Sequence, residues 1–394
     1  MATTIRQLRR YVQKIARKTN LSSGETKLLT DCIVGICNSG SCKVSDIVRA
    51  LHNRVPFRQE TRQFYDLLSD PKAEFEQLRD AWLQLSAPNA NRMPFIAVDP
   101  SEFIKRYGKD FDCLATIRDA SDPDKRLGNG FSSLQIDATD DLHRNLPLWQ
   151  ETYSTMHPQY RNLYDFVGRA MLKVLSRVGL HATWLFDRGF DAADFYRILH
   201  GLCITWVVRQ LGTRNVLVGN DRTILMSDLA ASLDKPHVAE VPYVDKKSHQ
   251  MKSCPVRFCY TPVRLPGQSG RFFMVVITGL RSEDMILLTN KDISSVRQAR
   301  CIVRAYMRRW GVEEGIRFWK QKTGVEDFRV RNWHSIRRLT FFSMLACGIQ
   351  ALWLLTRPAM AERLIARVKV FIKDVPFKNY RLWDGVQDAL RSGA

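Results

Sequence analysis

The distribution of hydrophobic residues divides the chain into a helical N-terminal part and a mixed α/β part. In the first 85 residues apolar side chains recur at helical spacing, which predicts helices over 24–37, 44–51 and 58–68 between polar breaks. The segment 86–93 contains Ala, Asn and Pro and is typical of a linker. Residues 1–85 are therefore expected to form a small, basic, all-α domain.

Two of these helices allow two interpretations. The helices at 44–51 and 58–68 lie on either side of a tight break, with Arg58 and Arg62 on the second. Such a pair occurs both in helix-turn-helix DNA-binding motifs and in ordinary helical hairpins. In either case, the basic side chains make residues 1–85 the expected DNA-binding domain.

After residue 93, short apolar runs predict β-strands. These runs are 94–99, 130–141, 145–154 and 181–190, and the segment 160–179 predicts a helix between the last two. The order strand, hairpin, helix, strand predicts an α/β fold with a mixed sheet. Its first part spans 94–212 and its second part 291–356. Residues 213–290 are expected to form a β-rich insertion between the two parts, and 357–394 a C-terminal helical tail.

The most apolar run, Leu339–Thr356, is close to the length of a membrane span. It contains Ser343, Gly348 and Gln350, and its aromatic and aliphatic side chains suit a helix buried inside a protein. We therefore predict a core helix and no membrane association.

The charge of the chain indicates the kind of partner. The formal net charge is +20 and the isoelectric point is near 9.8. A surplus of this size favours a polyanion such as nucleic acid, because each neutralised phosphate releases counterions. The nine cysteines show no CxxC pair and no zinc-finger spacing, which suits reduced thiols. The expected location is the cytoplasm, in association with the nucleoid.

The stretch "YMRRWGVEEGIRFWKQKTG", which runs from Tyr306 to Gly324, contains candidate catalytic residues. On one helix, four side chains fall within roughly 60° of one another, while Glu314 is turned away by about 100°. The four are Tyr306, Arg309, Glu313 and Lys320. An acid among cations occurs on ordinary solvated helices, and it also suits a site that binds a metal ion and a nucleic-acid backbone.

Two aspartates can complete such a site. Asp99 and Asp187 each lie at the end of a predicted buried strand, and with Glu313 they would supply three carboxylates. Carboxylate oxygens are ligands that Mg²⁺ prefers, and two such ions can assist displacement at a phosphodiester. By residue type alone, Asp119 and Asp137 are alternatives to Asp99.

The spacing Y-x2-R-x3-E-x6-K in this helix resembles the signature of DDE transposases of the bacterial insertion-sequence branch, which have an RNase H-like catalytic core. The segments "VDPSEFIKRYGKDFDCLATIRDAS" and "FDRGFD" resemble the regions around the first and second aspartates of that family. The resemblance covers about 94–356. It implies two further strands and a helix between the two acids, which favours Asp99 because Asp137 leaves room for only one strand and the helix.

The resemblance also implies an activity and its partners. Such an enzyme cleaves transposon-end DNA and joins the freed 3′ ends to target DNA, acting as a homodimer on two ends. Mg²⁺ would be held by Asp99, Asp187 and Glu313, and Mn²⁺ is expected to replace it. DNA phosphates would be held by Tyr306, Arg309 and Lys320. The alternatives are a non-catalytic DNA-binding regulator and a nuclease without strand transfer.

Two further positions have less definite implications. Arg188, beside Asp187, is expected either to reach DNA or to form a salt bridge within the fold. Relatives that form a DNA hairpin carry a tryptophan in a strand resembling 283–290, where it stacks at a flipped base. Met285 matches that position here, and residues 213–309 contain no tryptophan. A thioether stacks less well than an indole, so the resemblance implies a hairpin step only if Phe272 or Phe273 substitutes for the tryptophan.

Overall fold

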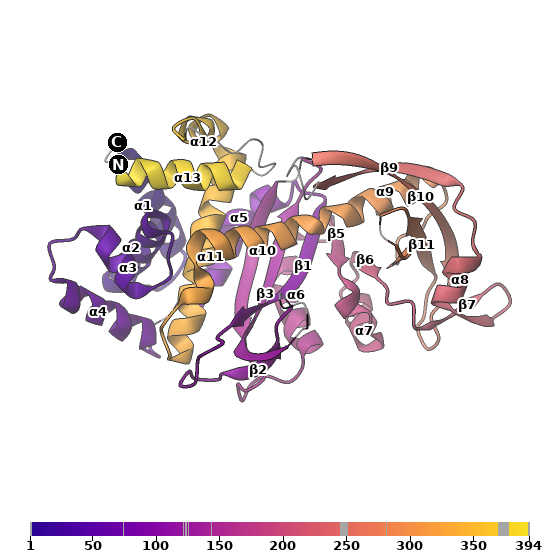
Figure 1. Cartoon of the computed structure of the whole chain (residues 1–394), viewed down its shortest axis with the longest axis horizontal. Coiled ribbons are helices and arrows are strands. Elements are labelled where there is room, and N and C mark those ends of the chain that lie inside the picture. The colour runs from indigo at the N-terminus through magenta and orange to yellow at the C-terminus, as the bar shows by residue number, and fades with distance from the viewer. Residues whose placement is uncertain are drawn as a thin grey trace.

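The computed structural model describes residues 2–73, 75–120, 122, 124, 126–142, 144–244, 251–280, 282–368 and 378–392. The molecule is elongated, with the N-terminal and C-terminal helices at one end, a large sheet in the middle and a β-rich part at the other end (Figure 1). Both termini lie in the helical end.

The N-terminal part is all-helical, as the sequence predicted. Its helices are α1 (Ala2–Ala16), α2 (Ser23–Ser39), α3 (Val44–Leu51), α4 (Phe57–Ser69) and α5 (Gln77–Ala90). The expectation of a linker at 86–93 was wrong, because α5 continues through most of it. Trp82 and Ser86 are fully buried, so packing of this helix on the sheet outweighs the local linker composition.

The central part has the strand order of an RNase H-like core. Its elements are β1 (Phe95–Ile104), β2 (Ala115–Arg118), β3 (Leu127–Thr139), β4 (Asn145–Tyr153), α6 (Leu163–Val178), β5 (Thr183–Phe186), the 3-10 helix η1 (Arg188–Phe190), α7 (Ala193–Gly201) and β6 (Thr205–Arg209). Strand β3 pairs antiparallel with both β4 and β1, and β1, β5 and β6 run parallel. The predicted mixed α/β core is confirmed, and β2 is an additional edge strand on β3.

The β-rich segment extends the core sheet. It contains β7 (Asn215–Val218), β8 (Arg222–Leu225), α8 (Met226–Ser232), β9 (His237–Val244), β10 (Met251–Val263), β11 (Phe272–Thr278) and β12 (Met285–Thr289). Strand β12 pairs antiparallel with β6, so the described strands form one ten-stranded sheet, while β7 and β8 form a separate pair. The segment predicted as an insertion is therefore continuous with the core through backbone hydrogen bonds.

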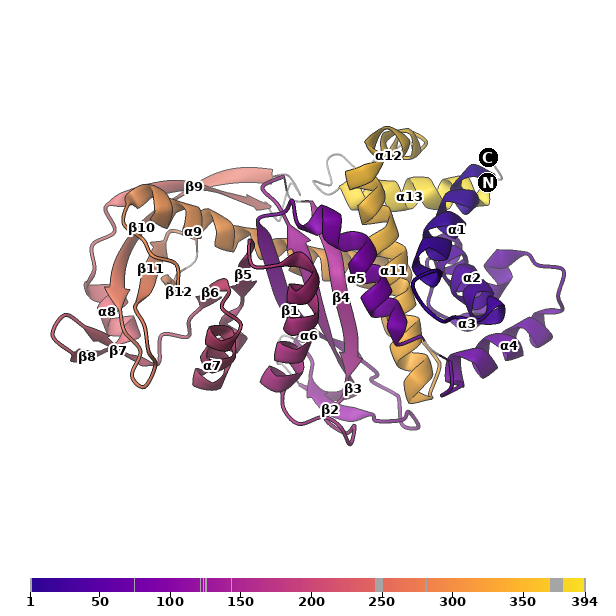
Figure 2. The same cartoon turned by 180° about the vertical axis from the view of Figure 1, so that it is seen from behind.

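The remaining helices return across the sheet. They are α9 (Val296–Arg308), α10 (Trp310–Thr323), the 3-10 helix η2 (Val325–Asp327), α11 (Trp333–Thr356), α12 (Pro358–Ile365) and α13 (Lys378–Arg391). Helices α9 and α10 cross one face of the sheet (Figure 1), and α5 and α6 lie on the opposite side (Figure 2). Of the expected C-terminal helical tail, 369–377 and 393–394 fall outside the described residues.

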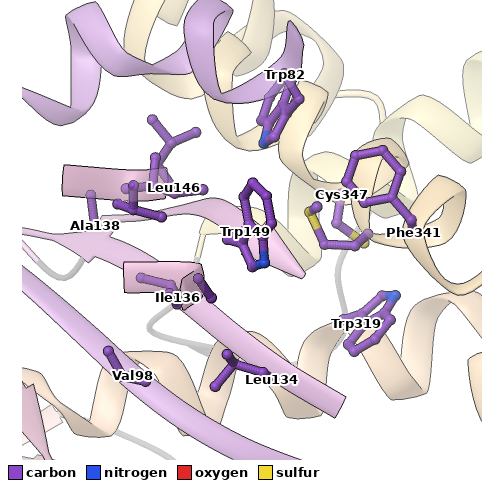
Figure 3. Close-up of a cluster of buried hydrophobic side chains, with 14 of the residues drawn as sticks. Trp82, Val98, Leu134, Ile136, Ala138, Leu146, Trp149, Trp319, Phe341 and Cys347 are labelled. Carbon is purple, nitrogen blue, oxygen red and sulfur yellow. The ribbon is translucent and has the colours of Figure 1, made fainter. Parts of the chain in front are cut away.

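Helix α11 is the apolar helix predicted from the sequence. In the described part of the chain it alone is long and apolar enough to cross a membrane by length and composition, yet 83% of its most apolar window is buried inside the protein. It packs against β4 and against several N-terminal helices. Figure 3 shows Phe341 and Cys347 of α11 in a hydrophobic cluster with Trp149 of β4 and Trp82 of α5. Helix α11 therefore joins the N-terminal helices to the sheet.

Strand β4 lies at an edge of the sheet, and α5 protects that edge. The indole nitrogen of Trp82 donates to the Pro147 carbonyl at 2.9 Å, and Nε of Arg79 donates to the Gln150 carbonyl at 2.8 Å. Side chains thus satisfy carbonyl groups that a further strand would otherwise pair with. The N-terminal helices are in this way fixed to the core that holds the candidate site.

Candidate active site

Two adjacent parallel strands bring Asp99 and Asp187 together. Val98 of β1 is in register with Phe186 of β5, and each is followed directly by an aspartate, Asp99 or Asp187. Neighbouring strands are separated by about 4.8 Å. The structure differs from the prediction in one respect: Asp99 does not end its strand, because β1 continues to Ile104. Asp187 does follow the end of β5, and its Oδ1 accepts a hydrogen bond from the Gly189 amide at 3.0 Å.

Arg309 connects Asp99 to Glu313. Nη1 of Arg309 donates to Oδ1 of Asp99 at 3.2 Å, and Nη2 pairs closely with Oε1 of Glu313. The predicted single helix is interrupted at Arg309, which lies between α9 and α10. The side chains of Asp99 and Arg309 are 15% and 12% exposed, whereas that of Glu313 is 38% exposed and therefore only partly buried. The structure still brings Glu313 to the same guanidinium as Asp99.

The acids affect one another electrostatically. The pKa of Asp99 is raised well above its ordinary value, first by burial and then by Glu313 and Asp187, against the opposing effect of Arg309. The pKa of Arg309 is raised despite its burial, because Tyr306, Asp99, Glu313 and Asp187 favour its positive charge. The three carboxylates therefore create a negative potential that one guanidinium only partly neutralises.

A layer of buried polar side chains separates α10 from the sheet. Gln135 is in register with Asp99, and its Nε2 donates to both carboxylate oxygens of Asp137, at 3.0 and 3.2 Å. Nδ2 of Asn145 donates to the carbonyl oxygen of Gly311 in the first turn of α10. Oε1 of Gln135 and Oδ1 of Asn145 are buried and have no protein partner. This layer supports the helix that carries Glu313.

Two glycines allow α10 to lie close to this layer. A Cβ added at Gly311 would lie 2.7 Å from Oδ1 of Asn145, and one added at Gly315 would lie 2.9 Å from Oδ2 of Asp137. Both distances are shorter than van der Waals contact, so any larger residue would displace the helix or the layer. Glu313 lies between the two glycines in the sequence "GVEEG". This glycine spacing is the signal in the sequence for close packing of the helix, and it was missed.

The structure distinguishes the alternatives for the first acid. Asp137 is fully buried on β3, and β1 lies between β3 and β5, so Asp137 is not beside Asp187. Burial raises the pKa of Asp137 to about 7, although the hydrogen bonds from Gln135 act in the opposite direction. Asp119 follows the edge strand β2. The strand order therefore supports Asp99 as the partner of Asp187.

The two outer residues of the predicted stripe differ in their surroundings. Tyr306 is 4% exposed, and its ring centre lies 5.8 Å from the guanidinium carbon of Arg309. Lys320 lies two turns beyond Glu313, where Nζ donates to the Glu102 carbonyl at 2.6 Å and pairs with Oε1 of Glu326 at 3.0 Å. Lys320 is thus held near β1 but is not in contact with the carboxylates in the contacts that the structure describes.

The other expected DNA contacts lie apart from this cluster. Arg188 is exposed in η1, directly after Asp187. Met285 begins β12 and is only 7% exposed, packed in the core cluster under α9, so it offers little surface for stacking on a base. Arg58 and Arg62 are exposed on α4, on the far side of α11 from the sheet (Figure 1). The structure therefore places Arg188, but not Met285, where a ligand could reach it.

Glu314 has a structural position. It is 7% exposed, Oε1 accepts from the Tyr380 hydroxyl at 2.9 Å, and Oε2 pairs with Nη1 of Arg317 at 2.8 Å. The hydrogen bond with Tyr380 connects α10 to α13, while Arg317 lies on α10 itself. The adjacent glutamates thus face different surroundings, as the helical spacing predicted.

The three carboxylates have the chemistry that a hard divalent cation requires, but they are not close enough together to bind one jointly. Asp99, Asp187 and Glu313 offer only carboxylate oxygens, which are the ligands that a hard divalent cation prefers. No three His, Cys, Asp or Glu side chains in the described ranges are close enough together to hold a metal ion. Arg309 lies between Asp99 and Glu313, so shared coordination by the acids requires its guanidinium to withdraw from at least one of them.

Comparison with known proteins identifies the family. A sequence model described as "Transposase DDE domain" matches residues 131–347, more than half of the chain. The chain belongs to this family. The DDE transposase match includes Asp187 and Glu313 and begins after Asp99. No curated protein matches the chain in sequence.

One solved structure has a distant likeness to this DDE transposase. It is the cryo-EM structure of a piggyBac transposase synaptic complex with hairpin DNA, with a TM-score of 0.48 and 11% sequence identity. The likeness covers 99% of this chain and 79% of the other.

Proposed function

We propose that the protein is a cut-and-paste DNA transposase of the bacterial insertion-sequence branch with the Y-R-E-K signature. It would cleave transposon-end DNA and join the freed 3′ ends to target DNA. The observation that carries the proposal is the contact of Arg309 with both Asp99 and Glu313, together with the position of Asp187 on the strand next to Asp99, in a chain of the DDE family.

The three carboxylates would hold Mg²⁺, with Mn²⁺ able to replace it. When bound, the metal would supply a Lewis acid for activating the attacking oxygen and stabilising the leaving oxygen. Asp99 and Asp187 are fixed by adjacent strands, whereas Glu313 is carried by a helix resting on the polar layer of Gln135 and Asn145. The protein thus provides two fixed acids and a third whose position depends on the seating of α10.

The cations around the carboxylates would bind the DNA backbone. Arg309 already lies between two acids, and a guanidinium can bind a phosphate with two parallel hydrogen bonds. Tyr306, Lys320 and Arg188 would add contacts near the cleaved phosphodiester. Arg58 and Arg62 on α4 would contribute to recognition of the transposon end. With a net charge of +20, the whole chain favours DNA, and we propose that two copies pair two ends in association with the nucleoid.

The test is an assay that contains both donor ends and a target plasmid, with Mg²⁺ or Mn²⁺. The transposase proposal expects joined product. Cut ends without joining would identify a nuclease, and a mobility shift alone would identify a DNA-binding regulator. Single changes of Asp99, Asp187 or Glu313 to Ala should each abolish cleavage and preserve end binding. Strong cleavage by the Glu313→Ala protein would refute the assignment of the site.

A further inference from the structure

A separate cavity of about 290 Å³ lies beside β4, between the loop that follows this strand, α6 and the start of α11. We call it the β4 pocket. Figure 2 shows the side of the molecule on which β4 and α6 are exposed to view. Gln150 of β4 is in register with Gln135, which belongs to the layer beneath α10. Because side chains alternate along a strand, the flanking Trp149 and Glu151 point to the opposite face. The β4 pocket is thus on the other face of the sheet from the candidate active site.

Aromatic rings form much of the lining of the β4 pocket. They are Trp149, Tyr153, His157, Tyr160, Phe166 and Trp333. Tyr153 and Tyr160 are stacked, with ring centres 5.7 Å apart and planes inclined by 6°. The rings of His157 and Trp333 lie 5.3 Å apart. The cavity volume is at the small end of the range for ligand pockets, which is of the order of 300–1,000 Å³. It suits a single flat ring system.

Cations stand among these rings. Arg169 and Lys173 come from α6 and Arg337 from α11. Arg169 and Lys173 make long pairs with Asp165 and Asp80, at 3.6 and 3.5 Å, between side chains that are all about half exposed. Such pairs contribute little to stability, so either cation can exchange its partner for a phosphate.

Arg337 and Glu151 add a fixed polar pair within the lining. Arg337 is held by Glu76 at 2.9 Å and by Glu151 at 3.2 Å. The other oxygen of Glu151 accepts from the Trp149 indole nitrogen at 3.3 Å. Burial lowers the pKa of His157, with further lowering by Arg337, which favours the neutral imidazole that stacks as an uncharged ring. Aromatic rings, weakly paired cations and a carboxylate acceptor together match the chemistry of a nucleotide, which has a flat base, an anionic phosphate and amino groups on the base edge.

We propose that the β4 pocket binds one unpaired nucleotide, with the base against Tyr160 and His157, whose side chains are partly exposed, and the phosphate at Arg169 and Lys173. Stacking of bases on aromatic side chains beside a basic surface is how proteins hold single-stranded nucleic acid without sequence preference. The nucleotide can belong to a DNA strand or be free in solution. The net charge of +20 and the membership of the DDE transposase family favour a DNA strand.

Photocrosslinking of the full-length protein without divalent metal tests the proposal. The first probe is a single strand of about twelve nucleotides that carries one 5-iododeoxyuridine, a length within the site sizes of single-strand binding proteins. The second probe is the same strand in a perfect duplex. The third is free 5-iododeoxyuridine monophosphate. Cross-links to the segment Tyr153–Tyr160 or to Trp333 are expected, more strongly with the single strand than with the duplex. Equal cross-linking by the free monophosphate would identify a free nucleotide as the source of the same chemistry.

Matched variants make the result specific. Tyr160→Ala should weaken binding of the single strand by roughly 5- to 150-fold, the contribution of one stacked base, whereas Tyr107→Ala, at a tyrosine that is 89% exposed, should not. Lys173→Ala should weaken binding of the single strand more than the control variant Lys109→Ala, which changes an exposed lysine outside the pocket. Cross-links only at other sites, or unchanged binding by both pocket variants, would overturn the proposal. Asp99→Ala should leave these cross-links intact, which separates this result from failure of the catalytic proposal.

Discussion

Arg309 and Asp99, 210 positions apart in the chain, are joined by a hydrogen bond of 3.2 Å between Nη1 and Oδ1. The same guanidinium also pairs with Glu313. In the protein without metal, Arg309 therefore supplies the positive charge that the acids require. Burial, together with Glu313 and Asp187, nevertheless raises the pKa of Asp99 well above its ordinary value, against the opposing effect of Arg309. This relationship makes the site sensitive both to loss of an acid and to binding of a cation.

Asp99→Asn should separate these two effects in thermal unfolding. A buried carboxyl group with a raised pKa destabilises the native state once the pH exceeds the pKa that the group has in the unfolded chain. Without metal, Asp99→Asn should therefore be at least as stable as the wild type at pH 7. Mg²⁺ at 100 times its Kd should stabilise the wild type by about 2.7 kcal/mol, and should stabilise the variant much less. The measurement is the Tm of both proteins with and without Mg²⁺. Equal shifts in both proteins would mean that Asp99 is not a ligand.

Asp137→Asn should change how stability depends on pH. The pKa of Asp137 is raised from 3.8 to about 7 in the folded protein by burial. As the pH rises, the native state therefore keeps this proton to a higher pH than the unfolded chain does. The contribution of Asp137 to stability is fully present below about pH 4 and falls by about 1.4 kcal/mol per pH unit up to about pH 7.

Urea unfolding at a series of pH values checks this prediction. The stability of the wild type relative to Asp137→Asn should fall across pH 4–7 and then level off. Asparagine has nearly the same shape and can still accept one hydrogen bond from Gln135, so the comparison isolates the charge. Parallel stability curves for the two proteins would show that Asp137 has an ordinary pKa.

The sequence predicted the elements that carry Asp99, Asp187 and Glu313 better than the surroundings of these acids. Periodicity and spacing indicated the strands before Asp99 and Asp187 and the helical face of Glu313, because these depend on neighbouring residues. The contact of Asp99 with Arg309 depends on a fold that joins distant segments. The extent of α5 was missed because tertiary packing of Trp82 overrides the local composition of 86–93. Likewise, the pairing of β12 with β6 depends on long-range hydrogen bonds that no local pattern encodes.

Gly315→Ala should reduce cleavage without preventing DNA binding. In an open helix this change would stabilise the protein by up to about 1 kcal/mol. Here the new Cβ would lie 2.9 Å from Oδ2 of Asp137, and overpacking of this kind typically costs about 1–3 kcal/mol. Displacement of α10 would move Glu313, and a misplacement of about 1 Å can reduce a rate by about 100-fold.

The matched control for Gly315→Ala is Gly201→Ala, because a Cβ added at this glycine of α7 meets nothing within 4 Å. Cleavage rates and end-binding affinities of both variants give the comparison. Wild-type cleavage by Gly315→Ala would show that close seating of α10 is not needed for catalysis.

Combined replacement of Arg58 and Arg62 by Ala should weaken binding to transposon ends. Deleting residues 1–85 is a poor test, because α2 and α4 cover α11 and their removal would expose core residues. The Arg62 side chain is 84% exposed and has only a 3.7 Å pair with Asp66, so its replacement should leave the fold intact. The slope of binding against salt should fall by about one for each phosphate that the variant no longer neutralises. Lys27→Ala, at an exposed lysine of α2, is the control, and an equal loss of affinity there would indicate a general charge effect.

Glu313→Gln should mainly reduce cleavage and Glu314→Gln should mainly reduce stability, although the two residues are adjacent. Glu313 contacts Arg309, which also contacts Asp99. Replacing the Glu313 carboxylate by an amide should therefore remove a metal ligand and with it several kcal/mol of transition-state stabilisation. Each 1.4 kcal/mol corresponds to about tenfold in rate, so cleavage should fall by at least about 100-fold.

Glu314→Gln should affect stability more than catalysis. The Tyr380 hydroxyl can still donate to the amide oxygen, while the pair with the half-exposed Arg317 is weakened. Hydrogen bonds of this kind typically contribute about 0.5–3 kcal/mol, so the change should lower Tm but leave most of the cleavage activity. The Tm increase on adding Mg²⁺ should persist in Glu314→Gln and disappear in Glu313→Gln. Equal damage to cleavage from the two changes would contradict the placement of Glu313 in the active site, since the two side chains contact different partners.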